Sequence, residues 1–306
     1  MNTPLWGIDL GGTKIEGVIL KDQNSIKELV RPRIPTEANK GYEHIVNQIV
    51  RLVDQMKTET GLQPESIGFG TPGSLDPMTQ TMKNSNTTCL NGQPLHRDLE
   101  NRLGVPVLLA NDANCFAVAE ANLGVISQEI PNAKVVFGVI MGTGVGGGLV
   151  VNGQVLHGKN GIGGEWGHNF LDASGGDCYC GKSGCVERVL SGTALERFYK
   201  GLTGKHRKMK EIMQLYHAKT DDAAIQTIER MIEKFGEAIS VIINIIDPDA
   251  IVLGGGLGNI DLLYSAGVEA TRKHIFNPFP HHTPFLKPKL GDSAGVFGAA
   301  LLTMKK

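Results

Sequence analysis

The chain has 306 residues, which is enough for two domains or for one large one. Its 30 Lys and Arg residues nearly balance its 31 Asp and Glu residues, so its charge gives no reason to expect nucleic acid or an anionic membrane as the main partner. The start, MNTPLWGIDL, lacks the pattern of a signal peptide, and no apolar run reaches the roughly 20 residues of a membrane span. Five cysteines, three of them clustered, favour a reducing compartment, and we expect a cytoplasmic protein.

The first expected element is a hairpin near the N-terminus. Residues 6–20 place apolar runs on both sides of Gly11-Gly12, which predicts a strand, a tight turn and a returning strand. A hairpin turn is the commoner use of such a glycine pair, but glycines also let backbone amides approach a phosphate closely. Asp9, just before the turn, suits Mg²⁺, which favours a carboxylate and retained waters.

Asp112 lies where a strand is expected to pass into a helix. A helix is expected over residues 41–57, and a strand over 105–111 leads to another helix over 114–122. Taken alone, Asp112 is better explained as a helix N-cap than as a catalytic base. A carboxylate at the carboxyl end of a strand nevertheless lies where α/β proteins bind ligands, and nearby asparagines, including Asn86 and Asn111, carry amides suited to sugar hydroxyls.

A second glycine hairpin is expected half a chain later. Residues 135–151 repeat the pattern around Gly142-Thr143-Gly144, which suggests two related lobes, and a buried strand over 250–254 opens into further glycines. Three such groups favour a nucleotide-phosphate site over turns alone. Residues 142–147 also match GxGxxG by letter, but a strand follows instead of the required helix, so dinucleotide binding is disfavoured.

Residues 163–192 contain a pattern typical of a zinc site. One histidine and three cysteines have suitable ligand types and close spacing, and two glutamates flank them: His168, Cys178, Cys180, Cys185, Glu165 and Glu187. The alternative is four unrelated residues that merely fall close together. Four protein ligands leave no open position on the metal, so a zinc ion here would be structural.

The C-terminal half alternates helix and strand. Residues 222–246 show an apolar period near 3.6 and end at Asp247-Pro248; the last turns, VIINII, are apolar nearly all round, which predicts deep burial. Residues 293–304 are small and apolar and should pack closely on a neighbouring element. The alternation of strands and helices predicts an α/β fold.

Taken together, these segments resemble a known family. The chain contains, in order, GIDLGGTK, GFGTPGSLD, LANDANCFAVAEA, GTGVGGG, GEWGHN, CYCGKSGCVE, LSGT and DPDAIVLGGG. This series resembles the ROK family (repressors, open reading frames and sugar kinases) from Trp6 to Leu302. KNSNTTCLNGQPL, GEWGHN and CYCGK are most similar to bacterial fructokinase and mannokinase members, with N-acetylglucosamine kinases as near neighbours.

The resemblance implies a fold and an assembly. The fold would be α/β, with two ribonuclease-H-like lobes of the actin-like ATPase and sugar kinase superfamily and an interlobe cleft. The smaller lobe would comprise residues 1–121 and 290–306, and the larger lobe residues 122–289. A ROK repressor is disfavoured because the sequence before Trp6 has no room for a winged helix. The family implies a homodimer.

The resemblance also implies a reaction, the ATP-dependent phosphorylation of a hexose at its 6-hydroxyl. Fructose is expected first, with mannose or glucose also accepted, and N-acetylglucosamine is the alternative. Asp112 would be the general base. The sugar would contact Gly73, Asn86, Asn111, Glu165, His168 and Glu187. ATP with Mg²⁺ would contact Asp9, Gly11, Gly12, Thr13, Lys14, Gly142, Thr143, Gly144, Gly255 and Gly256. Structural Zn²⁺ would be bound by His168, Cys178, Cys180 and Cys185.

Overall fold

The computed structural model describes residues 3–23, 25–276 and 282–304. The chain divides into two compact units. The first consists of residues 1–133, 148–164 and 288–306, and the second of residues 134–147 and 165–287. The lobe boundaries expected from the sequence stay a prediction.

The first unit is built on a mixed sheet with the strand order β3-β2-β1-β5-β8, and β4 also pairs with β2. These strands are β1 Leu5–Leu10, β2 Lys14–Leu20, β3 Glu28–Val30, β4 Arg33–Pro35, β5 Ile67–Thr71 and β8 Val107–Asn111. The expected N-terminal hairpin is confirmed, because β1 and β2 pair antiparallel, whereas β5 runs parallel to both β1 and β8. The unit also contains the small hairpin β6 Ser74–Leu75 and β7 Met82–Lys83, and β11 Gln154–Val155. Strand β10, Val145–Val151, begins in the second unit and ends in the first.

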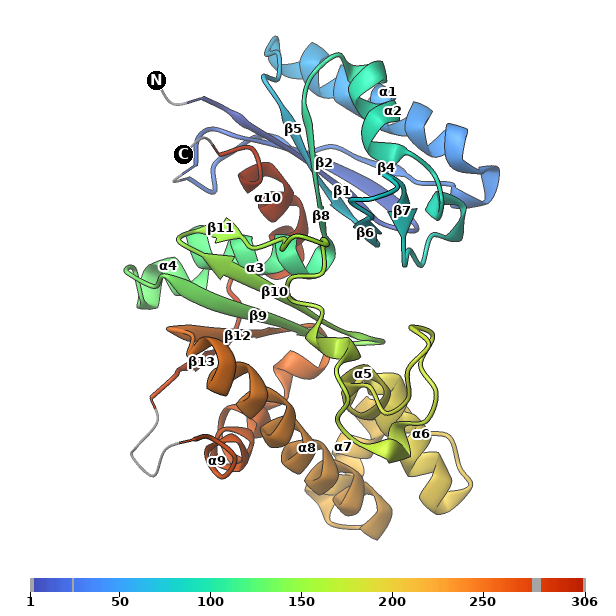
Figure 1. The fold of residues 1–306 in the computed structure, drawn as a ribbon, viewed down its shortest axis with the longest axis vertical. Helices are drawn as coiled ribbons and strands as arrows, with labels where there is room; N and C mark the ends of the chain where they lie inside the picture. Colours follow the sequence, from blue (N-terminus) through green and yellow to red (C-terminus); the bar gives the residue numbers. More distant parts are fainter. Residues whose placement is uncertain (1–2, 24, 277–281, 305–306) are drawn as a thin grey trace. The chain divides into compact units, whose positions relative to one another are not determined.

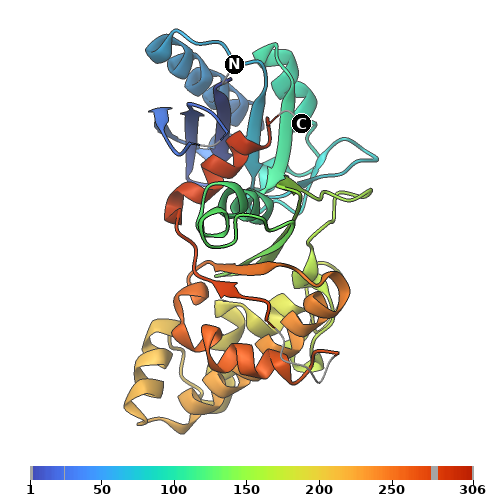
Figure 2. The same ribbon diagram turned by 90° about the vertical axis from the view of Figure 1, so that its left-hand side faces the viewer.

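Helices cover both faces of this sheet (Figures 1 and 2). The first unit contains α1 Tyr42–Thr60, α2 Leu95–Leu103, α3 Asp112–Asn122, α4 Val125–Glu129 and α10 Ala294–Leu301, with short 3-10 helices η1 Ala38–Lys40, η2 Thr88–Leu90 and η7 Gly291–Ser293. Alternate residues of β1, such as Ile8, pack with α1 and α2 in one apolar core. On the opposite face, a Cβ at Gly7 or Gly68 would lie 2.4 or 1.8 Å from backbone atoms of α10. The close packing expected of the C-terminal segment is therefore confirmed, and it requires glycine in the strands beneath.

A buried carboxylate ties the C-terminal segment of the chain to α3. Glu120 is fully buried and accepts hydrogen bonds from the backbone N–H groups of Val125, Lys289 and Leu290 at 2.9, 3.1 and 2.9 Å. Three backbone donors satisfy most of the hydrogen-bonding capacity of one carboxylate, which offsets the cost of burying it. Glu120 thereby fixes the start of the last segment of the first unit.

The second unit has a parallel sheet core. β9 Val135–Met141 and β13 Phe285–Leu286 pair on either side of β12 Ala250–Gly254, both in parallel. The helices are α5 Val186–Leu190, α6 Gly192–Thr203, α7 Met209–Ala218, α8 Asp222–Ile246 and α9 Ala266–Arg272, with 3-10 helices η3 Trp166–His168, η4 Ala173–Gly175, η5 Leu257–Asn259 and η6 Asp261–Tyr264. Strands followed by helices confirm the α/β expectation.

Helix α8 has the expected start and end but not the expected burial. The Asp221 side chain accepts from Ala224 N, which caps the first turn, and Asp247 ends the helix in the left-handed region at φ 40°. The prediction that its last turns are deeply buried is wrong, because Val241 and Ile245 are 45% and 74% exposed. The helix buries one stripe at the 3.6-residue period, and these two residues lie outside it.

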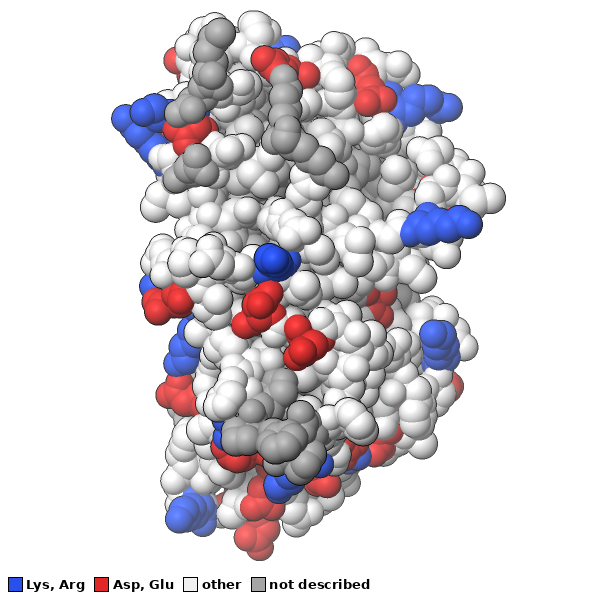
Figure 3. Space-filling view, turned by 60° about the vertical axis from the view of Figure 1, so that its left-hand side comes forward, with Lys and Arg blue, Asp and Glu red and all other residues white. Residues whose placement is uncertain are grey.

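Helix length and surface charge are the two features that bear on membrane and nucleic-acid binding. Among the helices of the described residues, none is both long and apolar enough to cross a membrane. On the face drawn in Figure 3, acidic and basic side chains are interspersed and do not gather into a large patch of one sign. This agrees with the net charge of −1.

Candidate functional site

In the first unit, three parallel strands end at one edge of the sheet. Asp9 of β1 is in register with Gly70 of β5, and Thr71 of β5 is in register with Asn111 of β8. Ligands of α/β proteins bind at such carboxyl edges. The edge therefore brings together Asp9 and Asn111, two residues expected in the site, and adds Thr71, whose hydroxyl donates to the carbonyl oxygens of Gly73 and Ala110.

Asp112 directly follows this edge as the first residue of α3. The N-cap explanation of Asp112 is wrong, because Asn111 is the cap and its Oδ1 accepts from Asn114 N at 2.8 Å. The residue is exposed, yet the surrounding protein desolvates its carboxyl and raises its pKa above the ordinary value. Asp112 is thus a carboxylate that a small molecule can reach and whose affinity for a proton is increased. Both properties suit a general base.

Asp9 is the second carboxylate of this region. Burial, with the charges of Glu16 and Asp112 as further causes, raises the pKa of Asp9 to about 6. A divalent cation would reverse this effect, because it stabilises the ionised carboxylate. Asp9 therefore fits the role of holding Mg²⁺, directly or through water.

The β1–β2 turn is held by Thr36, the residue that follows β4. Gly11 N donates to Lys14 O at 3.0 Å, which closes the turn. The fully buried Thr36 donates from Oγ1 to Gly11 O at 2.6 Å and from its N–H to Thr13 O at 3.0 Å. Gly12, Thr13 and Lys14 stay exposed. The turn is thus fixed in shape while its tip remains accessible.

The remaining expected sugar residues of the first unit lie near the β6–β7 hairpin. A Cβ at Gly73 would be 2.7 Å from Lys83 O, so the hairpin requires glycine there. Asn86 is exposed and follows the buried Ser85, whose N–H donates to Asn91 Oδ1.

In the second unit, the turn at residues 142–144 and the glycines after β12 are neighbours. A Cβ at Gly255 would lie 2.3 Å from Met141 O, and Gly255 has φ 76°, so only glycine fits. Gly255 and Gly256 are both exposed. Because β9 and β12 are parallel neighbours, these glycines form a second carboxyl edge at which a nucleotide can approach the backbone.

The same turn contacts the segment that carries the cysteines. Glu187 Oε2 accepts from Val145 N at 3.1 Å and would be 2.5 Å from a Cβ at Gly144. Trp166 Nε1 donates to Gly146 O at 3.1 Å. Gly192 N and Thr193 Oγ1 donate to Gly142 O and Thr143 O at 2.7 and 2.8 Å. The expected phosphate turn is thus braced by residues that follow Glu165 in the chain.

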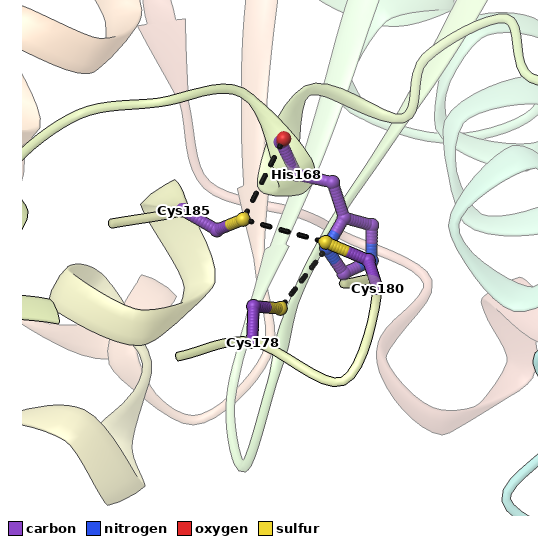
Figure 4. Close-up of side chains that lie close together, drawn as sticks. All are labelled: His168, Cys178, Cys180 and Cys185. Atoms are coloured by element: carbon purple, nitrogen blue, oxygen red, sulfur yellow. Dashed lines mark hydrogen bonds between the residues drawn. The ribbon is translucent and has the colours of Figure 1, made fainter. Parts of the chain in front are cut away.

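The four expected zinc ligands converge (Figure 4). One ligand atom from each of His168, Cys178, Cys180 and Cys185 lies within 4.8 Å of all the others. Cys178 Sγ is 3.6 Å from His168 Nδ1, and Cys180 Sγ is 3.6 Å from Cys185 Sγ. Ligand atoms around tetrahedral zinc are separated by about 3.3–3.8 Å, as follows from zinc–ligand bonds of about 2.0–2.3 Å. All five cysteines of the chain are free, so none is committed to a disulfide. The cluster therefore fits a closed Cys3His site.

Tyr179 supports the histidine of this cluster. Its hydroxyl lies 3.0 Å from His168 Nε2, so that with Nδ1 directed at Cys178 both ring nitrogens face protein groups. Such a partner on the second nitrogen fixes the tautomer of a metal-binding histidine. Burial and the adjacent thiols of Cys180 and Cys178 raise the pKa of Cys185 to about 12, and a bound dication would instead favour the thiolate.

Comparison with known proteins identifies the family. The sequence profile of the ROK family matches residues 5–306. The chain belongs to the ROK family. It is 38% identical to the N-acetyl-D-glucosamine kinase of Pasteurella multocida (strain Pm70), over 98% of this chain and 99% of that protein.

Solved structures of ROK proteins share the fold. The ROK hexokinase from Thermus thermophilus has a TM-score of 0.87 at 32% identity, covering 98% of this chain and 97% of that one. A ROK family glucokinase from Streptomyces griseus, solved with glucose and AMPPNP, has a TM-score of 0.74 at 26% identity, covering 97% and 98%. The expected α/β fold of the sugar kinase superfamily is thereby confirmed.

The ROK motifs did not point to every residue of interest. Glu16 was not expected, although it is an acidic residue in the middle of the apolar strand β2. A buried charge is costly unless it is paired, so this position is a usable sequence signal. Burial alone would raise the pKa of Glu16, but hydrogen bonds from Arg33 and Arg31 outweigh burial and lower it.

Proposed function

We propose that this protein is an ATP-dependent sugar kinase that phosphorylates N-acetylglucosamine. The choice of substrate rests on the 38% identity to an N-acetyl-D-glucosamine kinase over nearly the full length of both chains. The substrate that was the alternative in the sequence analysis thereby moves ahead of fructose.

Asp112 is the general base in this proposal. Its carboxylate takes the proton of the sugar 6-hydroxyl, the hydroxyl oxygen bonds to the γ-phosphorus, and the bond from that phosphorus to the bridging oxygen of ADP breaks. The accessible position of Asp112 and its raised pKa support this role. In phosphoryl transfer the protein mainly positions groups and neutralises charge, and one correctly placed carboxylate is sufficient for the proton.

The two glycine turns bind the nucleotide in this proposal. The proposed phosphate contacts are Gly11, Gly12, Thr13, Lys14, Gly142, Thr143 and Gly144, and the proposed adenosine contacts are Gly255 and Gly256. Mg²⁺, when bound, neutralises phosphate charge, and Asp9 holds it. The support is the accessible backbone at both carboxyl edges and the absence of room for side chains at Gly144 and Gly255.

The proposed sugar contacts are those that the family resemblance implies: Asn86, Asn111, the Gly73 backbone, Glu165 and Glu187. The two glutamates suit this role because carboxylates make strong hydrogen bonds to hydroxyls. Since both ring nitrogens of His168 face protein groups, its part in sugar binding is to hold the loop that carries Glu165. Zn²⁺, when bound by His168, Cys178, Cys180 and Cys185, supplies rigidity to that loop.

A hexose is the second candidate. The favouring observation is the similarity to the ROK hexokinase from Thermus thermophilus, at a TM-score of 0.87. Fructose, mannose and glucose remain test substrates on this basis and on that of the motif resemblance.

An ADP-release assay with a panel of sugars tests the substrate. With N-acetylglucosamine, N-acetylmannosamine, fructose, mannose and glucose at equal concentrations, N-acetylglucosamine should give the highest kcat/KM, and phosphorus NMR should place the phosphate on O6. A higher kcat/KM with fructose would reject the proposed substrate. No turnover with any sugar would reject the kinase.

A variant tests the base. Asp112→Asn should lower kcat by about 10²–10⁴-fold, the range for a lost general base, while sugar binding measured by calorimetry persists. Near-wild-type turnover would reject the assignment. Sedimentation of the same preparations tests the homodimer, which stays a prediction.

A further inference from the structure

Glu16 is surrounded by three cations. Its side chain is 1% exposed, and its Oε1 lies 2.5 Å from Arg31 Nε and 2.8 Å from Arg33 Nε. Lys14 Nζ lies 3.7 Å from its other oxygen. Arg31 is also paired with Glu28, so Glu16 leaves a surplus of about one positive charge on Arg33 and Lys14 at neutral pH.

The cluster is placed by strand register. Glu16 of β2 is directly opposite Asp9 of β1 and directly opposite Arg33 of β4. Directly opposed residues in antiparallel strands have their side chains on the same face, so Asp9, Glu16 and Arg33 form one row across three strands. Lys14, two residues before Glu16, lies on that face as well and belongs to the exposed turn at residues 11–14.

The three cations are not equivalent. Arg31 is 19% exposed and is bound elsewhere, because its Nη1 donates to Glu28 and Ser293 and its guanidinium lies over the Phe297 ring. These contacts account for Arg31 as a structural residue.

Arg33 and Lys14 differ from Arg31 in exposure and in partners. They are 49% and 48% exposed, and within residues 3–23, 25–276 and 282–304 Glu16 is the one ion-pair partner of each. Glu16 therefore holds two half-exposed cations beside the turn without neutralising both.

We propose that Arg33 binds the β- or γ-phosphate of the nucleoside triphosphate together with Lys14, and that Glu16 is the positioning residue that holds both cations. This rests on the proposed function, which brings the triphosphate to the turn at residues 11–14. A guanidinium bonds phosphate oxygens through a planar fork, and anchoring its Nε on Glu16 leaves the two terminal nitrogens for the anion. Anchoring also reduces the side-chain entropy lost on binding.

Nucleotide titrations test the proposal without any sugar. Calorimetry with ATP, ADP and adenosine, all with Mg²⁺, should show that Arg33→Ala weakens ATP binding by about tenfold or more, as expected for a lost charge-assisted hydrogen bond, and leaves adenosine binding unchanged. Arg33→Lys should restore part of the affinity, since it keeps the charge but loses the fork. Arg51→Ala, at an exposed arginine of α1 in the same unit, is the matched control and should bind all three ligands as the wild type does.

Glu16→Gln tests positioning. If Glu16 acts through Arg33 and Lys14, Glu16→Gln and Arg33→Ala disrupt the same interaction. The double variant should then lose less ATP-binding free energy than the sum of the two single losses. The Michaelis constant for ATP should rise while that for the sugar stays within about twofold, a split that general damage to the fold would not produce. Thermal melting shows whether the Glu16→Gln protein folds. If it does not fold, the nucleotide titrations of Arg33→Ala alone test the proposal.

The outcomes are separable. Wild-type affinity of Arg33→Ala for ATP would overturn the phosphate role of Arg33, even if the wild type phosphorylates a sugar. An equal loss of adenosine and ATP binding would also overturn it. If the wild type phosphorylates no sugar, the kinase proposal fails, whereas ATP and adenosine titrations still report on Arg33.

Discussion

The two glycine-rich turns, residues 11–14 of the first unit and residues 142–144 of the second, have similar sequences and different supports. The first is held by the Thr36 hydroxyl and lies beside the ion cluster around Glu16. The second is held by four groups, the Trp166 indole N–H, the Glu187 carboxylate, the Gly192 backbone N–H and the Thr193 hydroxyl, and these residues flank the Cys3His cluster. Local sequence therefore sets the shape of such a turn, while residues distant in the chain determine what stabilises it.

Of all the changes considered, loss of the metal should produce the largest difference between the two turns. Cys180→Ser should lose zinc, because three ligands bind it far more weakly than four, and should lower the free energy of unfolding by more than about 4 kcal/mol. Metal analysis and hydrogen exchange by mass spectrometry should show loss of zinc and of protection at residues 142–146 and 165–190, with residues 11–14 unchanged. Cys89→Ser, in the first unit, is the control and should keep the metal. A metal-free wild type with unchanged stability would contradict the structural zinc.

A methyl group at Gly255 should disturb the second turn alone. Gly255→Ala places a Cβ 2.3 Å from Met141 O at a positive φ, which should cost about 2–4 kcal/mol by urea unfolding. Gly256→Ala is the matched control, because a Cβ there would have no atom within 4 Å. Its free energy of unfolding should stay within about 0.5 kcal/mol of the wild-type value. Equal stability of the two variants would show that Gly255 does not lie against Met141.

The first turn should respond to pH through Asp9. Its pKa of about 6 in the folded protein exceeds the ordinary 3.8, so its favourable contribution is complete below pH 3.8 and is lost as the pH rises through 6. Asp9→Asn removes this loss and should stabilise the protein without magnesium and nucleotide by at most about 3 kcal/mol at pH 8, with no gain at pH 4. Urea unfolding at both pH values measures this. A pH-independent effect of Asp9→Asn would refute the burial argument.

The smallest effect is expected at Thr36. Thr36→Val keeps the shape of the side chain but removes the hydrogen bond to Gly11 O, which should cost about 1 kcal/mol and raise the Michaelis constant for ATP slightly. Thr36→Ser keeps the hydroxyl and should retain more of that affinity. If both variants change ATP binding equally, the hydroxyl does not brace the turn.

Much of the fold was predictable because its signals are local. The apolar run, glycine pair and second apolar run of residues 6–20 specify a hairpin, and the 3.6-residue period of residues 222–246 specifies a helix. The four-ligand cluster was predictable because metal chemistry requires all four side chains to meet.

What could not be predicted depends on single-residue offsets or on distant partners. Asn111 and Asp112 are both good capping residues, and only the backbone shows that the helix starts one residue earlier than a cap at Asp112 requires. The surroundings of Glu16 come from β4 and the segment before it, whose place beside β2 no local pattern indicates. Val241 and Ile245 lie outside the buried stripe of α8, and because its last turns are apolar nearly all round, their sequence does not indicate which residues are buried.

The close packing of α10 against Gly7 and Gly68 has a consequence for how the chain folds during synthesis. The helix that covers this face of β1 and β5 emerges from the ribosome only after the whole second unit has been made. Until then the sheet presents bare backbone and apolar surface, the kind that attracts chaperones or misassembles. Glu120 then fixes the returning segment by its three N–H bonds, so the unit begun first at translation is the one completed last.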